Sequence, residues 1–417
     1  MFGLFRPETP LDKAGKLKLL CSVLVCGLAL AWLYMLAIGW LYGGAAQYAG
    51  LFFSLEHQFS DFFANYYGWN FSQAYQLNHC CISVTSGEDL LLYISSMITQ
   101  QWISFLVYSF IGSAAYIAYC VYETRQCSLR LRVAAVTVLT ACCYPFLFAL
   151  DRGNMQLFYF VFMAAFLVSY SRGAYMAAAV WFGLSLGIKP FQIVFAVLFM
   201  ADKRYRELLL AFGVFAIFVT ASAAVLSFAN GLSILQFINP PVGPDGGWAS
   251  GYHHKYVLGN VGLYHGHSVF GMLKVFALYY FGSGAEDPAL AARFVKPYFA
   301  AACAAFAYIG WFVIKKETVL WRRVALLTVC MTALPFVSAD YRLMLFVIPA
   351  MMFFNAAPAK NDAKYAMLFA LVLVPKNYYF AVPFLPPDVG QGMVLTPLVM
   401  LYFAGALMQE RGLAVWK

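Results

Sequence analysis

The chain has 417 residues, of which 63% are apolar and 11% charged. Soluble domains contain about 45–50% apolar and about 25% charged residues, so this composition excludes a single soluble globule. The 27 basic and 18 acidic residues give a net charge of +9. The basic residues form small clusters between apolar segments, which is typical of cytoplasmic loops and not of a nucleic-acid-binding surface. We therefore expect a polytopic membrane protein.

Apolar segments of about 20 residues predict membrane-spanning helices along the whole chain. The first is longer than a signal-peptide core, and we interpret it as an uncleaved span. Three of the twelve segments are short enough to be broken or re-entrant helices (174–188, 190–202 and 364–375). The predicted spans are residues 17–42, 99–121, 133–150, 154–171, 174–188, 190–202, 208–229, 295–314, 322–337, 342–357, 364–375 and 391–409.

Twelve crossings place both termini in the cytoplasm. In that arrangement the inner side holds 19 of the 27 basic and 8 of the 18 acidic residues, so the inner face carries +11 and the outer face −2. This bias agrees with the preference of Lys and Arg for the cytoplasmic side. The sequence predicts an all-α, polytopic helical bundle that forms one integral membrane domain over residues 1–417.

Two long connections, 43–98 and 230–294, face outward in this topology, whereas every inner connection is short. Long loops in a compact protein are usually functional or disordered. The first loop is rich in aromatic residues, which favours an ordered loop. Within the second we interpret Ser268 to Gly282 as an interfacial or re-entrant helix. We expect the chemistry to occur on the outer side.

Several charged residues lie at the outer ends of the spans: Asp151, Arg152, Lys189, Asp340 and Arg342. Ionisable groups at membrane depth are costly, which makes them candidates for a functional site. In an alternative interpretation, Asp151 pairs with Arg152 and Asp340 with Arg342, and these pairs only close turns. Lys189 has no acid within twelve residues. Its partner must therefore come from another segment or from a ligand.

Asp61 is the acid of the first outer loop with the most aromatic neighbours. Partial desolvation by such neighbours raises the pKa of a carboxylate and suits it to act as a general base. The alternative is an ordinary solvated aspartate. We interpret the adjacent pair Glu88 and Asp89 as solvated surface.

Four of the six histidines lie within fifteen residues of the second loop: His253, His254, His265 and His267. A metal site is one interpretation, but no Cys or carboxylate stands at ligand spacing apart from Asp245. We favour hydrogen-bond donors to an anionic or hydroxylated ligand. No nucleotide-binding or hydrolase fingerprint is present. The sequence thus predicts neither a metal nor a cofactor.

Four short motifs occur in order along the chain, at residues 61–67, 151–157, 187–190 and 338–342. In that order they resemble glycosyltransferase family 87 of the GT-C superfamily. The family commonly has an acidic-aromatic element in its first loop, an Arg-Gly-Gln-x-Asn-Leu element, an apolar Lys-Pro step and a Ser-x-Asp-His-Tyr-like turn. Here Asn154 and Gln156 exchange the Gln and Asn of the second element, and the fourth reads Ser-Ala-Asp-Tyr-Arg.

The resemblance implies a bundle of GT-C type in the bacterial inner (plasma) membrane, with its active site facing the periplasm. It also implies an inverting transfer of a sugar from a polyprenyl-phosphate donor to a glycolipid or glycan acceptor, and we expect a monomer without a cofactor. In this interpretation Asp61 is the catalytic base. The candidate ligands of the donor phosphate are Arg152, Lys189, Arg342, His253, His254 and His267. The candidate substrate-binding residues are Asn65, Tyr66, Trp69, Asn154, Gln156 and Asp340.

Two other functions stay open. A flippase or transporter for a lipid-linked sugar would use the same cations, but transporters usually show internal pseudo-symmetry, and the loops of this chain are long only on the outer side. An O-antigen-type ligase or polymerase uses lipid diphosphate donors with a related architecture.

Overall fold

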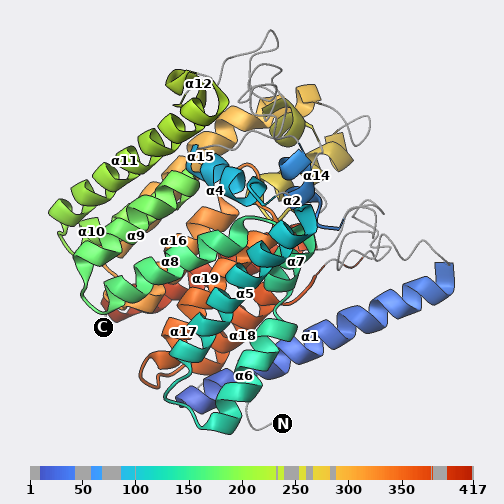
Figure 1. Ribbon diagram of the computed structural model, residues 1–417. Coiled ribbons are helices and arrows are strands. Elements are labelled where there is room, and N and C mark those ends of the chain that lie inside the picture. Colours follow the sequence, from blue (N-terminus) through green and yellow to red (C-terminus); the bar gives the residue numbers. More distant parts are fainter. Residues whose placement is uncertain are drawn as a thin grey trace. The chain divides into compact units, whose positions relative to one another are not determined.

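The computed structural model (Figure 1) describes residues 10–42, 58–67, 86–98, 100–231, 233–238, 253–259, 266–281, 288–376, 378 and 392–415. Within these ranges every regular element is a helix, and one isolated β-bridge joins Gly266 to Ala339. The all-α prediction is confirmed for this part of the chain. Backbone contacts group the residues into two compact units. The single-domain division of residues 1–417 stays a prediction.

The first unit comprises residues 1–56, 117–151 and 260–417. Its α1 packs against α6, α17 and α18, and α16 packs against α15, α17 and α19. The helices of this unit are α1 (Lys13–Tyr42), α6 (Leu129–Ala141), α7 (Tyr144–Arg152), α14 (Val269–Phe281), α15 (Pro288–Lys315), α16 (Leu320–Ala333), η6 (Asp340–Phe346), α17 (Val347–Asn355), α18 (Asp362–Leu373) and α19 (Gly392–Val415).

The second unit comprises residues 57–116 and 152–259. Its centre is α9, which packs against α8, α11, α4 and η4 (Figure 1). The helix α5 begins in this unit and continues into the first. The helices are α2 (Ser60–Tyr67), α4 (Ser86–Ser96), α5 (Gln101–Glu123), α8 (Gln156–Ser171), α9 (Tyr175–Ile188), η4 (Pro190–Phe195), α10 (Ala196–Ala201), α11 (Tyr205–Asn230), α12 (Ile234–Ile238) and η5 (His253–Leu258).

Five helices in the described part of the chain are long and apolar enough to cross a membrane: Lys13–Ala37, Gln101–Glu123, Tyr205–Asn230, Ala291–Lys315 and Gly392–Glu410. The pair α6 and α7 makes a sixth if it counts as one bent span. Each of the twelve predicted segments contains helix. The number of crossings, their orientation and the outer position of the loops stay predictions.

Three predicted spans are not continuous α-helices. Residues 133–150 divide into α6 and α7, which are bent by 48°. Pro145 explains the break, because it lacks an N–H group and its ring would clash with the carbonyl of residue 141, whereas it is tolerated in the first turn of a new helix. The segments 190–202 and 342–357 begin as the 3₁₀ helices η4 and η6.

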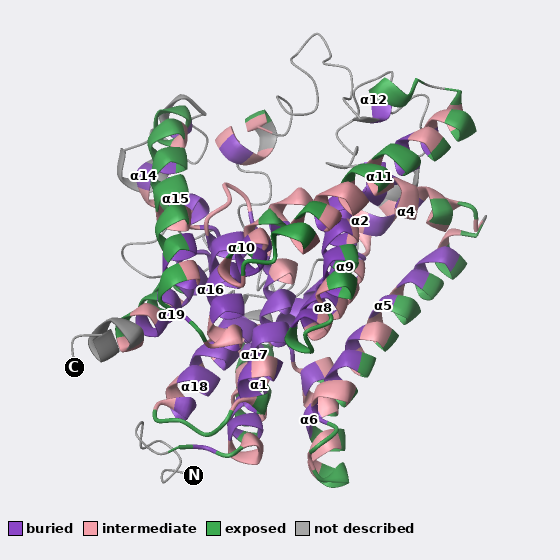
Figure 2. Cartoon of the chain, turned by 90° about the vertical axis from the view of Figure 1, so that its left-hand side faces the viewer, coloured by how far each residue is buried: buried purple, intermediate pink, exposed green. Residues whose placement is uncertain are grey.

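Large apolar side chains point outward from the long helices. Leu33 of α1 is 64% exposed, Phe110 of α5 is 74% exposed and Phe228 of α11 is 94% exposed. Figure 2 shows such exposed faces along α5, α11 and α15. Soluble proteins rarely expose apolar surface on this scale, so these faces fit contact with lipid.

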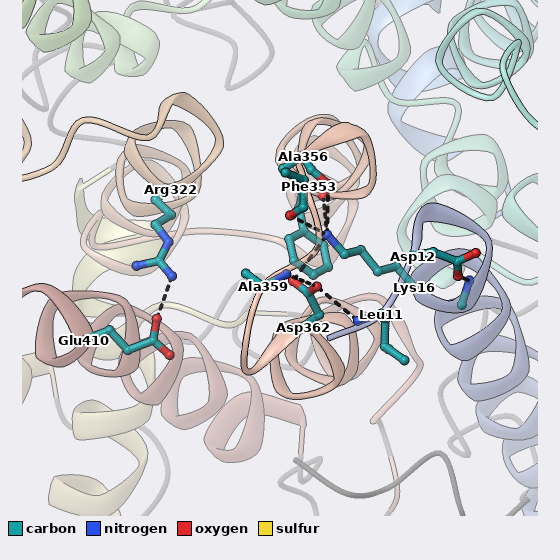
Figure 3. A network of polar contacts seen from close by, with 11 residues as sticks. Leu11, Asp12, Lys16, Arg322, Phe353, Ala356, Ala359, Asp362 and Glu410 are labelled. Carbon is teal, nitrogen blue, oxygen red and sulfur yellow. Dashed lines mark hydrogen bonds and ion pairs between the residues drawn. The ribbon is translucent and has the colours of Figure 1, made fainter. Parts of the chain in front are cut away.

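A buried ion pair joins three helices of the first unit (Figure 3). The Nζ atom of Lys16 lies 3.2 Å from Oδ1 of Asp362, and both side chains are almost fully buried. Lys16 also donates to the carbonyl of Ala356 at 3.1 Å, and Asp362 accepts from the backbone N–H of Ala359 at 2.7 Å. The sequence analysis did not identify this pair, whose partners are far apart in the chain. It connects the start of α1 with the end of α17 and the start of α18.

Candidate active site

The carboxylate of Asp61 is held by two different donors within the second unit. Nη2 of Arg152 forms an ion pair with Oδ1, and Nδ2 of Asn154 donates to Oδ2 at 2.7 Å. Nη1 of Arg152 also donates to the hydroxyl of Ser60 at 3.1 Å. The side chains of Asp61 and Arg152 are 19% and 21% exposed. The motif around Asp61 and the motif around Arg152 therefore meet at one polar, partly exposed site.

The turn between Arg152 and Gln156 fixes this geometry. Gly153 has a φ of +62°, and an added Cβ would lie 2.8 Å from Cβ of Phe62, so this position requires glycine. Oδ1 of Asn154 accepts from the backbone N–H of Gln156 at 3.0 Å, which satisfies one of the free N–H groups at the start of α8. The hydroxyl of Tyr108 donates to the carbonyl of Asn154.

The aromatic neighbours of Asp61 anchor its helix. Phe62 is 1% exposed and packs on the rings of Phe105 and Tyr108, and Phe63 packs on Trp102. All three of these partners belong to α5. The carboxylate itself faces a guanidinium and an amide. The aromatic surroundings expected for Asp61 are therefore those of its helix α2, whereas the carboxylate itself has polar neighbours.

Lys189 has a partner in another segment, which is one of the two alternatives that the sequence left open. Its Nζ lies 3.5 Å from Oε1 of Glu88 and 4.3 Å from the centre of the Tyr159 ring. The prediction of a solvated surface for Glu88 and Asp89 is wrong, because these residues are only 7% and 2% exposed. Their helix α4 packs against α9 and α11.

A glycine contact explains why Glu88 is buried. The backbone of Gly87 comes so close to the carbonyl of Gly187 and the ring of Phe218 that no side chain fits between them. The small residue before the acid was the available signal in the sequence. It indicates a close approach of some other segment to α4 but does not say which segment.

Two glutamines of the second unit are fully buried with unpartnered carboxamides. Gln156 at the start of α8 and Gln192 in η4 are each 0% exposed. Neither the Oε1 nor the Nε2 atom of either residue has a hydrogen-bond partner among the described residues. Gln192 was missed by the sequence analysis. The signal for it was a lone carboxamide in the apolar run that follows Lys189-Pro190.

A second polar cluster lies within the first unit. Nδ1 of His267 is 3.2 Å from Oδ1 of Asp340, and Nε2 of His267 is 2.9 Å from Oγ of Ser338. The hydroxyl of Tyr144 donates to Oδ2 of Asp340 at 3.2 Å. His267 is fully buried, and its backbone N–H donates to the carbonyl of Ser338 at 2.9 Å. These contacts fasten residue 267 to the turn at 338–340.

Burial lowers the pKa of His267 below its ordinary value of 6.5, and the hydrogen bond to Asp340 offsets part of this effect. The ring is therefore neutral at pH 7, so Nδ1–H donates to Asp340 and Nε2 accepts from the Ser338 hydroxyl. Both ring nitrogens of His267 are thus occupied, which favours a structural role for this residue. Its predicted role as a phosphate ligand stays untested. Burial also lowers the pKa of Lys376, to about 8.

The remaining predicted residues are placed as follows. Nη1 of Arg342 donates to the carbonyl of Val337 at 3.0 Å. His253 and His254 begin η5, the first half-buried and the second exposed. Asn65 and Tyr66 belong to α2, while Trp69 and His265 lie outside the described residues. Among the residues that the structure describes, no group of three or more His, Cys, Asp or Glu side chains is arranged to hold a metal ion.

The sequence profile of glycosyltransferase family 87 matches residues 90–338. This range includes Arg152, Asn154, Gln156, Lys189 and the histidines of the second loop, whereas Asp61, Asp340 and Arg342 lie outside it. No curated protein and no solved structure matches the chain.

Proposed function

The chain belongs to glycosyltransferase family 87, and from this premise we propose that it moves a sugar from a polyprenyl-phosphate donor to a hydroxyl of a glycolipid or glycan acceptor. The family and the apolar helices make it a membrane glycosyltransferase. The reaction is proposed to occur on the outer, periplasmic face of a bacterial inner membrane. One observation carries this proposal: the partly exposed carboxylate of Asp61 is held by Arg152 and Asn154.

Asp61 would act as the general base of an inverting displacement. Its carboxylate takes the proton of the acceptor hydroxyl while the acceptor oxygen forms a bond to the anomeric carbon of the sugar. The bond from that carbon to the phosphate oxygen breaks on the opposite face, and the lipid phosphate leaves with the bonding electrons. A carboxylate positioned in this way typically contributes 10²–10⁴-fold to the rate.

Arg152 connects the base to an anionic donor. A guanidinium has five N–H donors and binds carboxylates and phosphates with the same planar geometry. A donor phosphate near Arg152 would therefore share its charge with Asp61 and loosen the hold on that carboxylate. Asn154 would keep Oδ2 in place during this exchange. Lipid binding and exposure of the base would thus be coupled through one side chain.

Other predicted residues have supporting roles in this proposal. His253 and His254 belong to the same unit as Asp61 and supply additional donors for the phosphate. Asn65, Tyr66 and Trp69 follow Asp61 directly and would contact the acceptor, because sugar faces pack on aromatic rings. The ligand roles of His267, Asp340 and Arg342 stay predictions.

The proposal is tested with the purified protein in nanodiscs and two matched synthetic donors, a polyprenyl-phosphate sugar and the corresponding diphosphate. We expect mass spectrometry to detect glycosylated acceptor with the monophosphate donor. Product from the diphosphate alone would favour the ligase or polymerase. Movement of labelled donor across proteoliposomes without any product would favour the flippase.

A further inference from the structure

The buried glutamines Gln156 and Gln192 have unmet hydrogen-bonding capacity in the second unit. A carboxamide has two N–H donors and an oxygen that accepts two hydrogen bonds. Buried polar groups in proteins are nearly always paired, because leaving them unpaired costs free energy. Four side-chain atoms of these two residues are unpaired among the described residues. A ligand or ordered water must therefore complete this part of the protein.

The two glutamines flank one contact between α8 and the segment that contains η4. Lys189, the extended residue before η4, has its Nζ 4.3 Å from the centre of the Tyr159 ring on α8. Phe195, the last residue of η4, lies 6.3 Å from Phe166 of α8 between ring centroids. Gln192 thus lies between two points at which this segment meets α8.

On α8, Gln156 precedes Tyr159 by three residues, so both are on the same side of the helix. Gln156 therefore lies about one helical turn before Tyr159, whereas Gln192 follows Lys189 by three residues. The two glutamines thus lie on opposite sides of the Lys189–Tyr159 contact. The backbone N–H of Gln156 donates to Asn154, whose side chain holds Asp61. Polar contacts thus lead from the proposed catalytic carboxylate through Asn154 to Gln156 at the start of α8.

We propose that Gln156 and Gln192 hydrogen-bond hydroxyl groups of the sugar being transferred and determine which sugar the enzyme accepts. The inference rests on the proposed function. Carboxamides both donate and accept, which matches neutral hydroxyls better than it matches phosphate. A sugar that reaches the two glutamines would enter beside the ion pair of Lys189 and Glu88, whose side chains are 12% and 9% exposed. A site built to hydrogen-bond a hydroxyl strongly rejects analogues that lack it.

The test combines Gln192→Leu and Gln156→Leu with a set of polyprenyl-phosphate hexoses and pentoses and their deoxy analogues. The control is Gln126→Leu, an exposed glutamine in the connection between α5 and α6. We expect each buried variant to lower kcat/KM about tenfold for the preferred donor, the scale of a hydrogen bond. With the analogue that lacks the contacted hydroxyl, each variant should match the wild type. The control should match the wild type with every donor.

Unchanged kcat/KM with every donor in both variants, together with a raised melting temperature, would mean that the glutamines bind only water, and the inference would fail while the proposed function stands. A wild-type protein that uses none of the donors would overturn both. If Gln192→Leu does not fold, Gln192→Met keeps the unbranched shape and carries the same test.

Discussion

The side chain of Asn154 makes two hydrogen bonds, and its substitution gives a quantitative test of the site. Its side chain donates to Asp61 and accepts from the N–H of Gln156. In Asn154→Ala, losing a hydrogen bond to a charged group costs about 1.5–3 kcal/mol. Losing the acceptor at the start of α8 costs about 1 kcal/mol more. We therefore expect the free energy of unfolding to fall by roughly 3 kcal/mol.

A double-mutant cycle with Asp61→Ala, which removes the acceptor altogether, isolates the part that belongs to the carboxylate. The four proteins are unfolded by denaturant in mixed micelles, and the coupling free energy is calculated from the four unfolding free energies. We expect a coupling of about 1.5–3 kcal/mol, because only the bond between Asn154 and Asp61 depends on both side chains. A coupling below about 0.5 kcal/mol would show that Asn154 supports only the helix and would refute the geometry proposed for the base.

Three further predictions concern stability. Lys16→Met should lower the unfolding free energy by about 3–5 kcal/mol by leaving Asp362 buried without its cation. Adding Asp362→Asn should recover most of the loss, because the neutral carboxamide removes the buried charge while its oxygen still accepts from the N–H of Ala359. Because burial lowers the pKa of His267, the unfolded chain binds a proton that the folded chain does not. The denaturation midpoint should therefore decrease when the pH is lowered from 7.5 to 5.5, and His267→Gln should reduce this decrease. Gly87→Ala should lower the free energy of unfolding by about 1–3 kcal/mol, because the new Cβ would lie 2.6 Å from a ring carbon of Phe218. The control Gly213→Ala has nothing within 4 Å of its Cβ and should be neutral or stabilising. Thermal unfolding measures both variants.

The positions of the long apolar helices could be predicted from the sequence because apolar length alone marks them, whereas the short helices α2 and α4 lie in a predicted loop. The motif order also predicted that the Asp61 and Arg152 elements serve one site, and the structure joins them by an ion pair. The local rule for Pro145 predicts the break after α6, whereas hydropathy predicts one span because it does not register a bend.

Contacts between distant segments could not be predicted. The burial of Glu88 depends on a close approach of Gly87 to Gly187, and such an approach leaves no periodic signal in segments that are apolar all round. The pairing of Lys16 with Asp362 joins residues 346 positions apart. Likewise, the sequence shows Gln192 only as a polar residue in an apolar run, and its unpaired carboxamide is visible only once its neighbours are known.

The central claim is that Asp61 is the base of a glycosyl transfer, and the turnover number of Asp61→Asn tests it most directly. The asparagine keeps the shape of the side chain and part of its contact with Arg152, but its carboxamide cannot accept a proton. With a synthetic polyprenyl-phosphate sugar and glycolipid acceptors, we expect turnover to fall ~10²–10⁴-fold while donor affinity is kept or rises. Asp202→Asn, whose carboxylate accepts from Tyr170 at 2.8 Å, is the control and should retain wild-type turnover. Wild-type turnover in Asp61→Asn would contradict the account and direct attention to Asp151 or Asp340.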